Sequence, residues 1–394
     1  MNRLPRLLLA CLLGTACVHR DHPQSLRVYD DVPDSGPALS LALYQSVGVG
    51  LRPGHTVELV QDARITERLE AEIRQARESI HLLASNWQPG EASERLLRAL
   101  SERQPGVVCR ILVDPLHSPG FQEAVGTRLV QAGCEVRAFR PFVGSEVVFS
   151  DERMEARNHR QLVIRDGRSG LTGGSGVGPD GGGGAKKPAD TGRDTYVHVE
   201  GPAVRQLQQA FARDWLEAGG GLLPESAFPL LEPRGEARAG FVASTGSPSL
   251  SHSERMVQVL MAAARRRLWL TNACFVPTAA TVDTLIRKAR EGVDVRILVP
   301  GLLRGDSRGV LAAQRASYER LLENGVRLWE YQSAPLYART LVVDDQLTAV
   351  GSNNLEPNAN AMLEEGALVV EDAPLARALA DSFERDLSHA VEVR

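Results

Sequence analysis

Two stretches far apart in the chain carry polar residues at matching positions. The first spans residues 158–174 and the second residues 336–357. The matching residues are His159, Gln161 and Asp166 in the first stretch and Tyr337, Arg339 and Asp344 in the second. In both, an apolar run separates the second and third polar positions, and a Gly-Gly or Gly-Ser pair follows the Asp. The repeat predicts two copies of one strand-turn-strand unit, with a site between the two halves of the chain.

These residue types have well-defined chemistry. A neutral imidazole, such as that of His159, is a competent nucleophile near neutral pH, and an imidazolium is a competent acid. The guanidinium of Arg339 is a good bidentate ligand for phosphate. A histidine taken alone is more often structural, so the interpretation of His159 depends on its register with the second stretch. Asp166 and Asp344 lie where a strand meets a turn, a common place for Asp, and we predict a structural role for both.

Strand-like and helix-like runs alternate through the first half of the chain. The predicted elements are, in order, strand 57–60, helix 65–76, strand 79–85, helix 92–100, strand 107–114, helix 121–132, strand 134–139, strand 195–201 and helix 204–216. This alternation favours a largely parallel sheet covered by helices.

The second half repeats the same order. Its predicted elements are helix 255–264, strand 267–277, helix 282–289, strand 293–300, helix 309–322, strand 326–331, strand 367–372 and a closing helix. Short matches such as FARDW at 211–215 with FERDL at 383–387 support a duplication. The chain is long enough for two domains, each with its own core. We place them at 55–219 and 240–394, joined by a Gly- and Pro-rich linker at 220–239.

The first 17 residues have the pattern of an export signal. Arg3 and Arg6 precede a short apolar run, small residues and then Cys17. Small residues before a Cys resemble a bacterial lipoprotein signal, in which that Cys is lipidated; a plain secretory peptide is the alternative. Residues 18–54 lack sustained periodicity and predict a tether or loose lead-in. We therefore expect an exported protein of the bacterial cell envelope, anchored in the membrane as a lipoprotein and facing the periplasm.

Charge and cysteine content narrow the classes of partner. The net charge of −4 provides no global basic field, so we do not expect nucleic acid as a partner. Cys109, Cys134 and Cys274 lie in apolar runs without Cys-x-x-Cys spacing, and we expect no zinc site. Buried free thiols are the favoured interpretation, and a Cys109–Cys134 bridge is the alternative in an oxidising compartment.

The two stretches also carry a family resemblance. Each is similar to the His-x-Lys-x-x-x-x-Asp motif of the phospholipase D superfamily, and residues 57–390 most resemble its bacterial cardiolipin synthase branch. The resemblance implies an α/β fold of two duplicated domains, each a mixed β-sheet flanked by helices, related by a pseudo-two-fold. It implies chemistry without metal or cofactor. One His attacks a phosphodiester, the other His protonates the leaving alcohol, and Lys and Asn residues hold the phosphate.

Both motifs depart from the family pattern. Gln161 replaces Lys in the first, and Tyr337 and Arg339 replace His and Lys in the second. The resemblance then implies His159 as nucleophile and Tyr337 as a weak acid. The remaining residues that it implies are Glu365 as the carboxylate orienting the His, Asp194 at the comparable place in the first half, and Gln161, Arg339, Ser352 and Asn354 as phosphate ligands.

Two functions are compatible with these residues. The first is an active phosphodiesterase or phosphatidyltransferase that acts on envelope phospholipid through a phosphohistidine at His159. The second is a relative with degraded motifs, weak or inactive, that still binds phospholipid phosphodiesters in the same cleft. The second is favoured, because Tyr337 and Gln161 each remove a group that supports such a reaction. A phospholipid or other phosphodiester is the expected ligand in either case.

Overall fold

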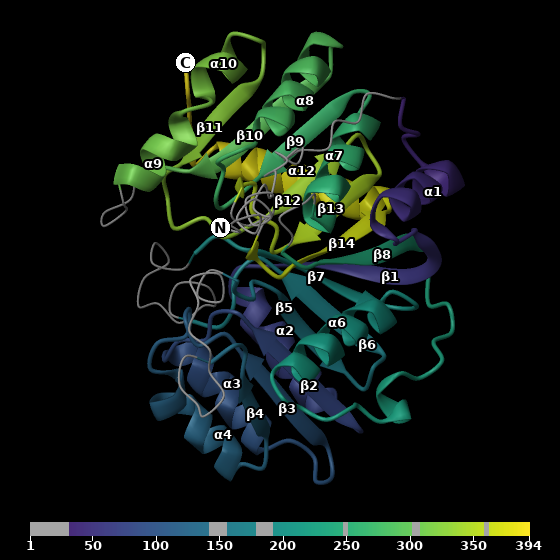
Figure 1. Ribbon diagram of the computed structural model, residues 1–394, viewed down its shortest axis with the longest axis vertical. Helices are drawn as coiled ribbons and strands as arrows, with labels where there is room; N and C mark the ends of the chain where they lie inside the picture. The colour runs from purple at the N-terminus through teal and green to yellow at the C-terminus, as the bar shows by residue number, and fades with distance from the viewer. Residues whose placement is uncertain (1–30, 142–155, 179–191, 247–250, 302–307, 358–361) are drawn as a thin grey trace, which may run out of the picture.

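The computed structural model of the chain describes residues 31–141, 156–178, 192–246, 251–301, 308–357 and 362–394 (Figure 1). The predicted export signal with Cys17 lies outside the described residues. In the described residues of the first half, the elements are β1 (Arg52–Gln61), α2 (Ala63–Gln75), β2 (Ser79–Ala84), α3 (Glu91–Ser101), β3 (Val108–Val113), α4 (Thr127–Gln131), β4 (Glu135–Ala138), β5 (Gln161–Arg165), β6 (Ser169–Gly173), β7 (Thr195–Glu200) and α6 (Val204–Glu217). A short π-helix, Gln122–Gly126, runs directly into α4.

The second half repeats this order. Its elements are β8 (Ala237–Ser244), α7 (His252–Ala263), β9 (Arg267–Thr271), α8 (Ala279–Arg290), β10 (Asp294–Pro300), α9 (Arg308–Arg315), α10 (Tyr318–Leu322), β11 (Arg327–Tyr331), β12 (Thr340–Val343), β13 (Leu347–Gly351), β14 (Glu365–Glu371), α12 (Ala373–Leu387) and β15 (Ala390–Glu392). Side-chain caps start three of its helices. The side chains of Ser251, Thr278 and Asp372 accept backbone N–H groups of the first turns of α7, α8 and α12.

The strands of the described residues all belong to one sheet, and the order of its strands shows the duplication. The order is β15-β11-β10-β9-β12-β13-β14-β8-β1-β7-β6-β5-β2-β3-β4. Counted outward from the central β8–β1 pair, the strands of the two halves follow in the same order, so each strand has a counterpart at the same position in the other half. Strand β15 is an extra strand at one edge. The central pair is antiparallel, as a two-fold between the halves requires. The predicted class, two duplicated α/β units related by a pseudo-two-fold, is confirmed.

The expectation of a largely parallel sheet was wrong. Parallel pairing joins β2, β3 and β4 in one half and β9, β10 and β11 in the other. Every other pair of neighbours is antiparallel. The motif strands β5 and β12 are followed by hairpin partners after short turns, and a hairpin turn forces antiparallel pairing. The sheet is therefore mixed.

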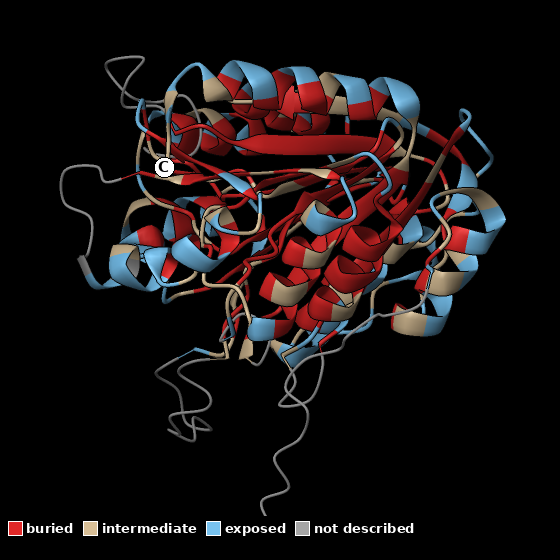
Figure 2. Cartoon of the chain, turned by 90° about the horizontal axis from the view of Figure 1, so that it is seen from above, coloured by how far each residue is buried: buried red, intermediate tan, exposed pale blue. Residues whose placement is uncertain are grey.

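The sheet is covered by helices, and three apolar clusters fill the spaces between. One cluster packs α2, α3 and α4 against the first half, and a second packs α7, α8 and α10 against the other. The third contains residues of α6 and α12 together with strands of both halves. Figure 2 shows the helices buried along their inner faces and exposed outside. The central cluster spans both halves, so they share a core.

The tether predicted for residues 18–54 is wrong where the structure describes it. Residues 36–47 form α1 (Gly36–Val47), and β1 begins at Arg52. Helix α1 packs against α7, with Leu39, Leu43 and Val47 buried in the core of the second half. On its outer face Leu41 and Tyr44 remain exposed. Apolar residues on both faces leave no amphipathic stripe, which explains why the sequence pattern did not predict this helix.

Two further sequence expectations change. Strand β8 begins at Ala237, inside the segment predicted as linker up to residue 239. Cys109 in β3 and Cys134, directly before β4, form a disulfide, so the favoured free thiols were wrong for this pair. Cys274 is a free, half-buried thiol. Adjacent parallel strands bring the first two cysteines together, which spacing alone could not show. Among the described residues, no helix is both long and apolar enough to cross a membrane.

The packing of α1 gives a stability prediction. Leu43→Ala should lower the free energy of unfolding by about 2–5 kcal/mol, because it empties a fully enclosed core position. Chemical denaturation followed by circular dichroism measures this. Tyr44→Ala, on the exposed face of the same helix, is the matched control and should change it by less than about 0.5 kcal/mol. Equal free energies of unfolding for the two variants would contradict the packing of α1 into the core.

Candidate functional site

The two motif stretches occupy equivalent places in the duplicated sheet. The first supplies β5 and its hairpin partner β6, and the second supplies β12 and β13. His159 lies two residues before β5, and Tyr337 lies three residues before β12. Both therefore stand at the strand ends that face the other half.

Backbone bridges hold each motif against the opposite half. The His159 N–H donates to the Glu364 carbonyl at 2.9 Å, and the Glu364 N–H donates to Arg157 at 2.8 Å. In the counterpart bridge the Tyr337 N–H donates to the Arg193 carbonyl, and the Arg193 N–H donates to Pro335, both at 2.8 Å. Glu365 and Asp194, the residues that follow the bridging positions, are thereby placed beside the opposite motif.

His159 meets a carboxylate across this interface. Its Nδ1 lies 3.3 Å from Oε1 of Glu365, whose side chain is buried while the imidazole is partly exposed. The other carboxylate oxygen, Oε2, accepts a hydrogen bond from the Ser352 hydroxyl. Ser352 in turn accepts the Gly366 N–H at 3.1 Å. Ser352, predicted as a phosphate ligand, is thus buried, and its hydroxyl fixes Glu365.

Arg339 joins the second motif to the first. Its Nε donates to the Asn354 amide oxygen at 2.5 Å, and its Nη1 donates to the Gly174 carbonyl at 2.8 Å and to the Tyr337 carbonyl at 3.0 Å. Asn354 also donates to Glu356 at 3.2 Å. A Cβ at Gly174 would stand 2.3 Å from the Tyr337 carbonyl oxygen, so the close approach requires glycine here.

Asp194 is the counterpart of Glu365 in the first half. Its carboxylate accepts the Ser175 hydroxyl at 2.7 Å, the Ser175 N–H at 2.9 Å and the Thr195 N–H at 2.7 Å. Burial raises the pKa of Asp194, against the effect of these hydrogen bonds. The same carboxylate-to-serine contact thus occurs in both halves, with an imidazole beside it only in the Glu365 copy.

The structure does not present Gln161 as a free phosphate donor. Its side chain is buried in β5 and donates to the Ser85 hydroxyl, while its amide oxygen accepts the Ser85 N–H at 3.2 Å. Both polar groups are therefore satisfied within the protein. The place that the family fills with a lysine is closed by this pair.

The motif aspartates tie down turns. Asp166 accepts the backbone N–H groups of residues 77, 78 and 79, at distances between 2.8 and 3.1 Å. Asp344 does the same for residues 265, 266 and 267, at 2.7 to 3.3 Å. Both have positive φ, 55° and 51°, a conformation that Asp tolerates better than most residues. These contacts are those of a structural role.

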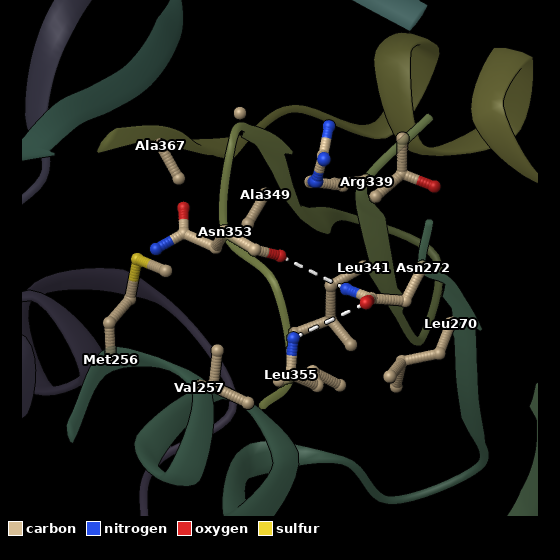
Figure 3. A pocket seen from close by; sticks show the side chains of 12 residues that line it. Met256, Val257, Leu270, Asn272, Arg339, Leu341, Ala349, Asn353, Leu355 and Ala367 are labelled. Atoms are coloured by element: carbon tan, nitrogen blue, oxygen red, sulfur yellow. Dashed lines mark hydrogen bonds between the residues drawn. The ribbon is translucent and has the colours of Figure 1, made fainter. Parts of the chain in front are cut away.

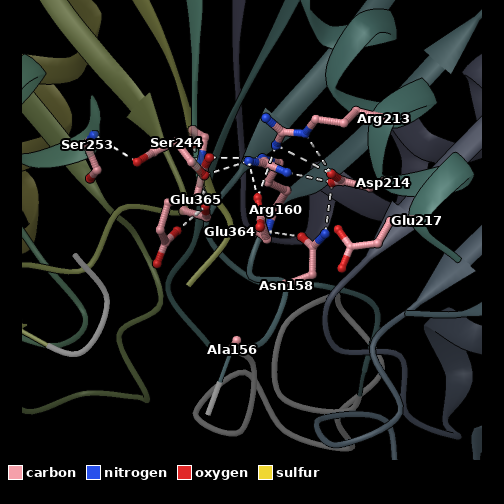
Figure 4. A network of polar contacts seen from close by, with 12 residues as sticks. Ala156, Asn158, Arg160, Arg213, Asp214, Glu217, Ser244, Ser253, Glu364 and Glu365 are labelled. Carbon is pink, nitrogen blue, oxygen red and sulfur yellow. Dashed lines mark hydrogen bonds and ion pairs between the residues drawn. The ribbon is translucent and has the colours of Figure 1, made fainter. Parts of the chain in front are cut away.

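Beside His159, a charged network that the sequence analysis missed is buried at the interface (Figure 4). Arg160 is fully buried, and its guanidinium contacts Asp214 at 2.6 Å and Glu364 at 2.8 Å. It also donates to the Ser244 carbonyl at 2.5 Å and to the Glu365 carbonyl at 2.9 Å. Burial opposes its charge, but the two carboxylates outweigh it and raise the pKa of Arg160. One side chain of the first motif therefore locks the segment carrying Glu365.

Asp114 is a second missed residue. This buried carboxylate pairs with the buried Arg157 at 2.9 Å and accepts the Asn158 N–H at 2.9 Å. In the loop that follows it, His117 brings its ring to 5.1 Å from that of His159, centroid to centroid and edge-on. No metal or nucleophile spacing distinguished His117 in the sequence. Only the fold of the loop brings His117 next to His159.

A cavity lies under the second motif (Figure 3). It measures about 30 Å³ and is lined mostly by apolar side chains, with Arg339 at its edge. This is room for about one water molecule. Within the described ranges, no group of three or more His, Cys, Asp or Glu side chains could hold a metal ion.

Comparison with known proteins places this site in context. The family model "Cardiolipin synthase, PLD-like domain" matches residues 257–387. The chain is 31% identical over 341 residues to cardiolipin synthase A of Pseudomonas putida, covering 86% of this chain and 69% of the relative. It is 29% identical over 343 residues to cardiolipin synthase 1 of Bacillus anthracis. That alignment covers 84% of this chain and 66% of the relative, so the chain spans slightly less than two thirds of the length of this relative.

A solved structure shares the fold. The crystal structure of phosphatidylserine synthase from Haemophilus influenzae matches with a TM-score of 0.66. The match covers 90% of this chain and 92% of that one at 15% identity. At this identity the likeness establishes the architecture of the duplicated sheet and no more.

The Arg160 network gives the second prediction. Arg160→Met should lower the free energy of unfolding by about 3–5 kcal/mol, because it leaves buried carboxylates without their partner. Arg213→Ala is the matched control: Arg213 contacts the same Glu364 at 3.0 Å, but its side chain is 47% exposed. Its loss should cost less than about 1 kcal/mol. Urea denaturation compares the two, and similar small losses would show that the network does not hold the interface.

Proposed function

Because this chain belongs to the phospholipase D superfamily, within its cardiolipin synthase-like branch, we propose that its interface site binds phospholipid phosphodiesters and turns them over slowly through His159. The observation that carries the proposal is the contact of His159 with Glu365, 3.3 Å across the interface. A carboxylate at Nδ1 favours the tautomer in which Nδ1 carries the proton, which leaves the Nε2 lone pair available for attack.

The reaction that fits this pair has two steps. In the first, Nε2 of His159 attacks the phosphorus, and the bond from phosphorus to the leaving alcohol oxygen breaks, giving a phosphohistidine. The leaving oxygen takes a proton from an acid. In the second, a water or an alcohol attacks the same phosphorus, and the P–N bond breaks. The outcome is hydrolysis with water and transfer with an alcohol.

Arg339 is the cation proposed to hold the phosphate. Two of its nitrogens are fixed by Asn354, Gly174 and Tyr337. Its Nη2 makes no hydrogen bond to the described residues, so it can donate to a phosphoryl oxygen without losing an existing contact. A fixed guanidinium costs little reorganisation when charge develops in the transition state. Asn354 is then a positioning residue for Arg339.

The rate is expected to be low for two reasons. A phenol has a pKa of about 10 against about 6.5 for His, so Tyr337 is a poor acid in neutral solution, and losing a positioned acid costs on the order of 10²–10⁴-fold. The Gln161 side chain is engaged with Ser85 and adds no cation. Loss of one such donor costs roughly 10²–10³-fold. The engagement of Gln161 is also the observation that favours the competing proposal, a site that binds without turnover.

The third prediction concerns the intermediate. Radiolabelled phosphatidylglycerol should transfer label to His159, and His159→Ala should abolish the label. Peptide mapping under alkaline conditions, where phosphohistidine survives, makes the assignment. Because the acid and the first cation are both missing, the Gln161→Lys/Tyr337→His double variant should react at least about 10²-fold faster.

The same variants separate the two functions. A wild-type chain as fast as the double variant would contradict slow turnover. No label in the wild type, with vesicle binding that is lost in Arg339→Ala, would establish the binding-only function instead. Absence of both labelling and binding would rule out a phosphodiester site.

We further propose that the chain acts in the cell envelope, attached to the membrane through a lipid on Cys17. The support is the pattern of residues 1–17. The fourth prediction is that the mature protein begins at Cys17 and carries an acyl group there, as measured by mass spectrometry of membrane fractions. A mature chain that begins elsewhere and is released without detergent would contradict the anchor, and Cys17→Ser is the control that should release the protein.

A further inference from the structure

We propose that His117 donates a hydrogen bond to the phosphoryl group that reacts at His159, and so takes the place of the cation that the first motif lacks. The inference rests on the proposed phosphodiester site. It makes His117 a residue that touches substrate, on a loop outside both motifs.

The imidazole rings of His117 and His159 lie close together. The His117 and His159 rings are 5.1 Å apart between centroids and meet edge-on at 74°. The His117 side chain is 37% exposed, whereas its Nδ1 is buried, without a hydrogen-bond partner, 3.9 Å from Oδ1 of Asp114. Burial of Nδ1 leaves Nε2 as the ring nitrogen on the accessible side. A group bound at His159 is therefore within reach of Nε2 of His117.

One carboxylate sets both rings. Asp114 accepts the N–H of Leu116, the residue before His117, at 3.0 Å. It also accepts the N–H of Asn158, the residue before His159, at 2.9 Å. Arg157 fixes the same carboxylate through Nε and Nη2. Since Asp114 is buried and immobilised in this way, the spacing of the two imidazoles is built into the fold.

The loop also reaches the place of the missing lysine. The Ser118 hydroxyl donates to the Ser85 carbonyl at 3.4 Å and accepts the Trp87 N–H at 2.9 Å. Ser85 is the residue that binds both polar groups of Gln161. His117 is thus attached, through its neighbour, to the residue that closes the lysine position. His117 on this loop thus supplies a donor close to the position in β5 where the first motif has Gln161 instead of a lysine.

The protonation of His117 depends on the charges around it and on whether an anion is bound. Burial, followed by the neighbouring His159 and by Arg157, lowers the pKa of His117, while Asp114 opposes this shift. The empty site therefore favours a neutral ring at neutral pH. A bound anion stabilises the imidazolium form, in which Nε2 carries a proton that it can donate. Anion affinity should accordingly rise as the pH falls from about 8 to about 5.5.

The test measures binding of inorganic sulfate to the full chain by isothermal titration calorimetry, because sulfate keeps its charge across this range. His117→Ala should weaken binding by about tenfold to a hundredfold, as expected for losing a hydrogen bond between charged groups. His117→Lys should restore the affinity and reduce its pH dependence. His389→Ala, an exposed histidine after α12, is the matched control and should bind as the wild type does.

Labelling of His159 by phosphatidylglycerol supplies the second readout. His117→Ala should slow it by roughly 10²–10³-fold, and His117→Lys should recover it. Sulfate binding that depends on His117, without any labelling in the wild type, would refute turnover and leave the role of His117 intact. Normal labelling and normal sulfate binding in His117→Ala would overturn the inference alone. Thermal unfolding of each variant, with His117→Gln as a neutral replacement, identifies losses that come from misfolding.

Discussion

The site depends on one constraint, a reciprocal exchange of backbone hydrogen bonds between the halves. The strand end that carries His159 is bonded to Glu364, and the one that carries Tyr337 is bonded to Arg193. In each bridge the residue that follows the bonding position presents a carboxylate to the opposite motif. Neither half can build this arrangement alone. The geometry of the nucleophile is therefore a property of the interface, which explains why the core, the sheet and the charged network all cross it.

Around these bridges the two copies have diverged in charge. Arg160 follows His159 and is held by Asp214 and Glu364. The equivalent position in the second motif is Ala338, and there the arginine comes from the other partner, because Arg193 pairs with Asp386 at 2.9 Å. Each half thus keeps a buried Asp on its last long helix, and the arginines that pair with these two residues, Arg160 and Arg193, both come from the first half. A buried charge needs a partner. The arginine can therefore lie on the motif in one site and on the bridging segment in the other only because both helices keep the aspartate.

Much of this was predictable from the sequence, and the failures have physical causes. The repeated motif predicted the duplication and the position of the hairpins, because an apolar run that ends in an Asp is typical of a strand followed by a turn. The parallel sheet was over-predicted because alternation of strands and helices does not reveal which strands are joined by hairpins. Helix α1 was missed because Leu41 and Tyr44 are exposed on its apolar outer face. Asp114 and His117 were missed because they act through a loop fold, and no spacing encodes it.

The bridges also place few demands on the side chains of the motifs. The bond from Tyr337 to Arg193 uses backbone atoms only, so a phenol or an imidazole at position 337 satisfies it equally. Gln161 likewise finds its partners in Ser85 and remains buried with both ends of its amide bonded. Gly174 has no such freedom, because any side chain would meet the Tyr337 carbonyl and Asp194. The fold therefore constrains glycines and bridging segments strictly and the reacting side chains weakly. A loop imidazole such as that of His117 can contact the phosphate proposed at His159 in this setting without any change in the bridges.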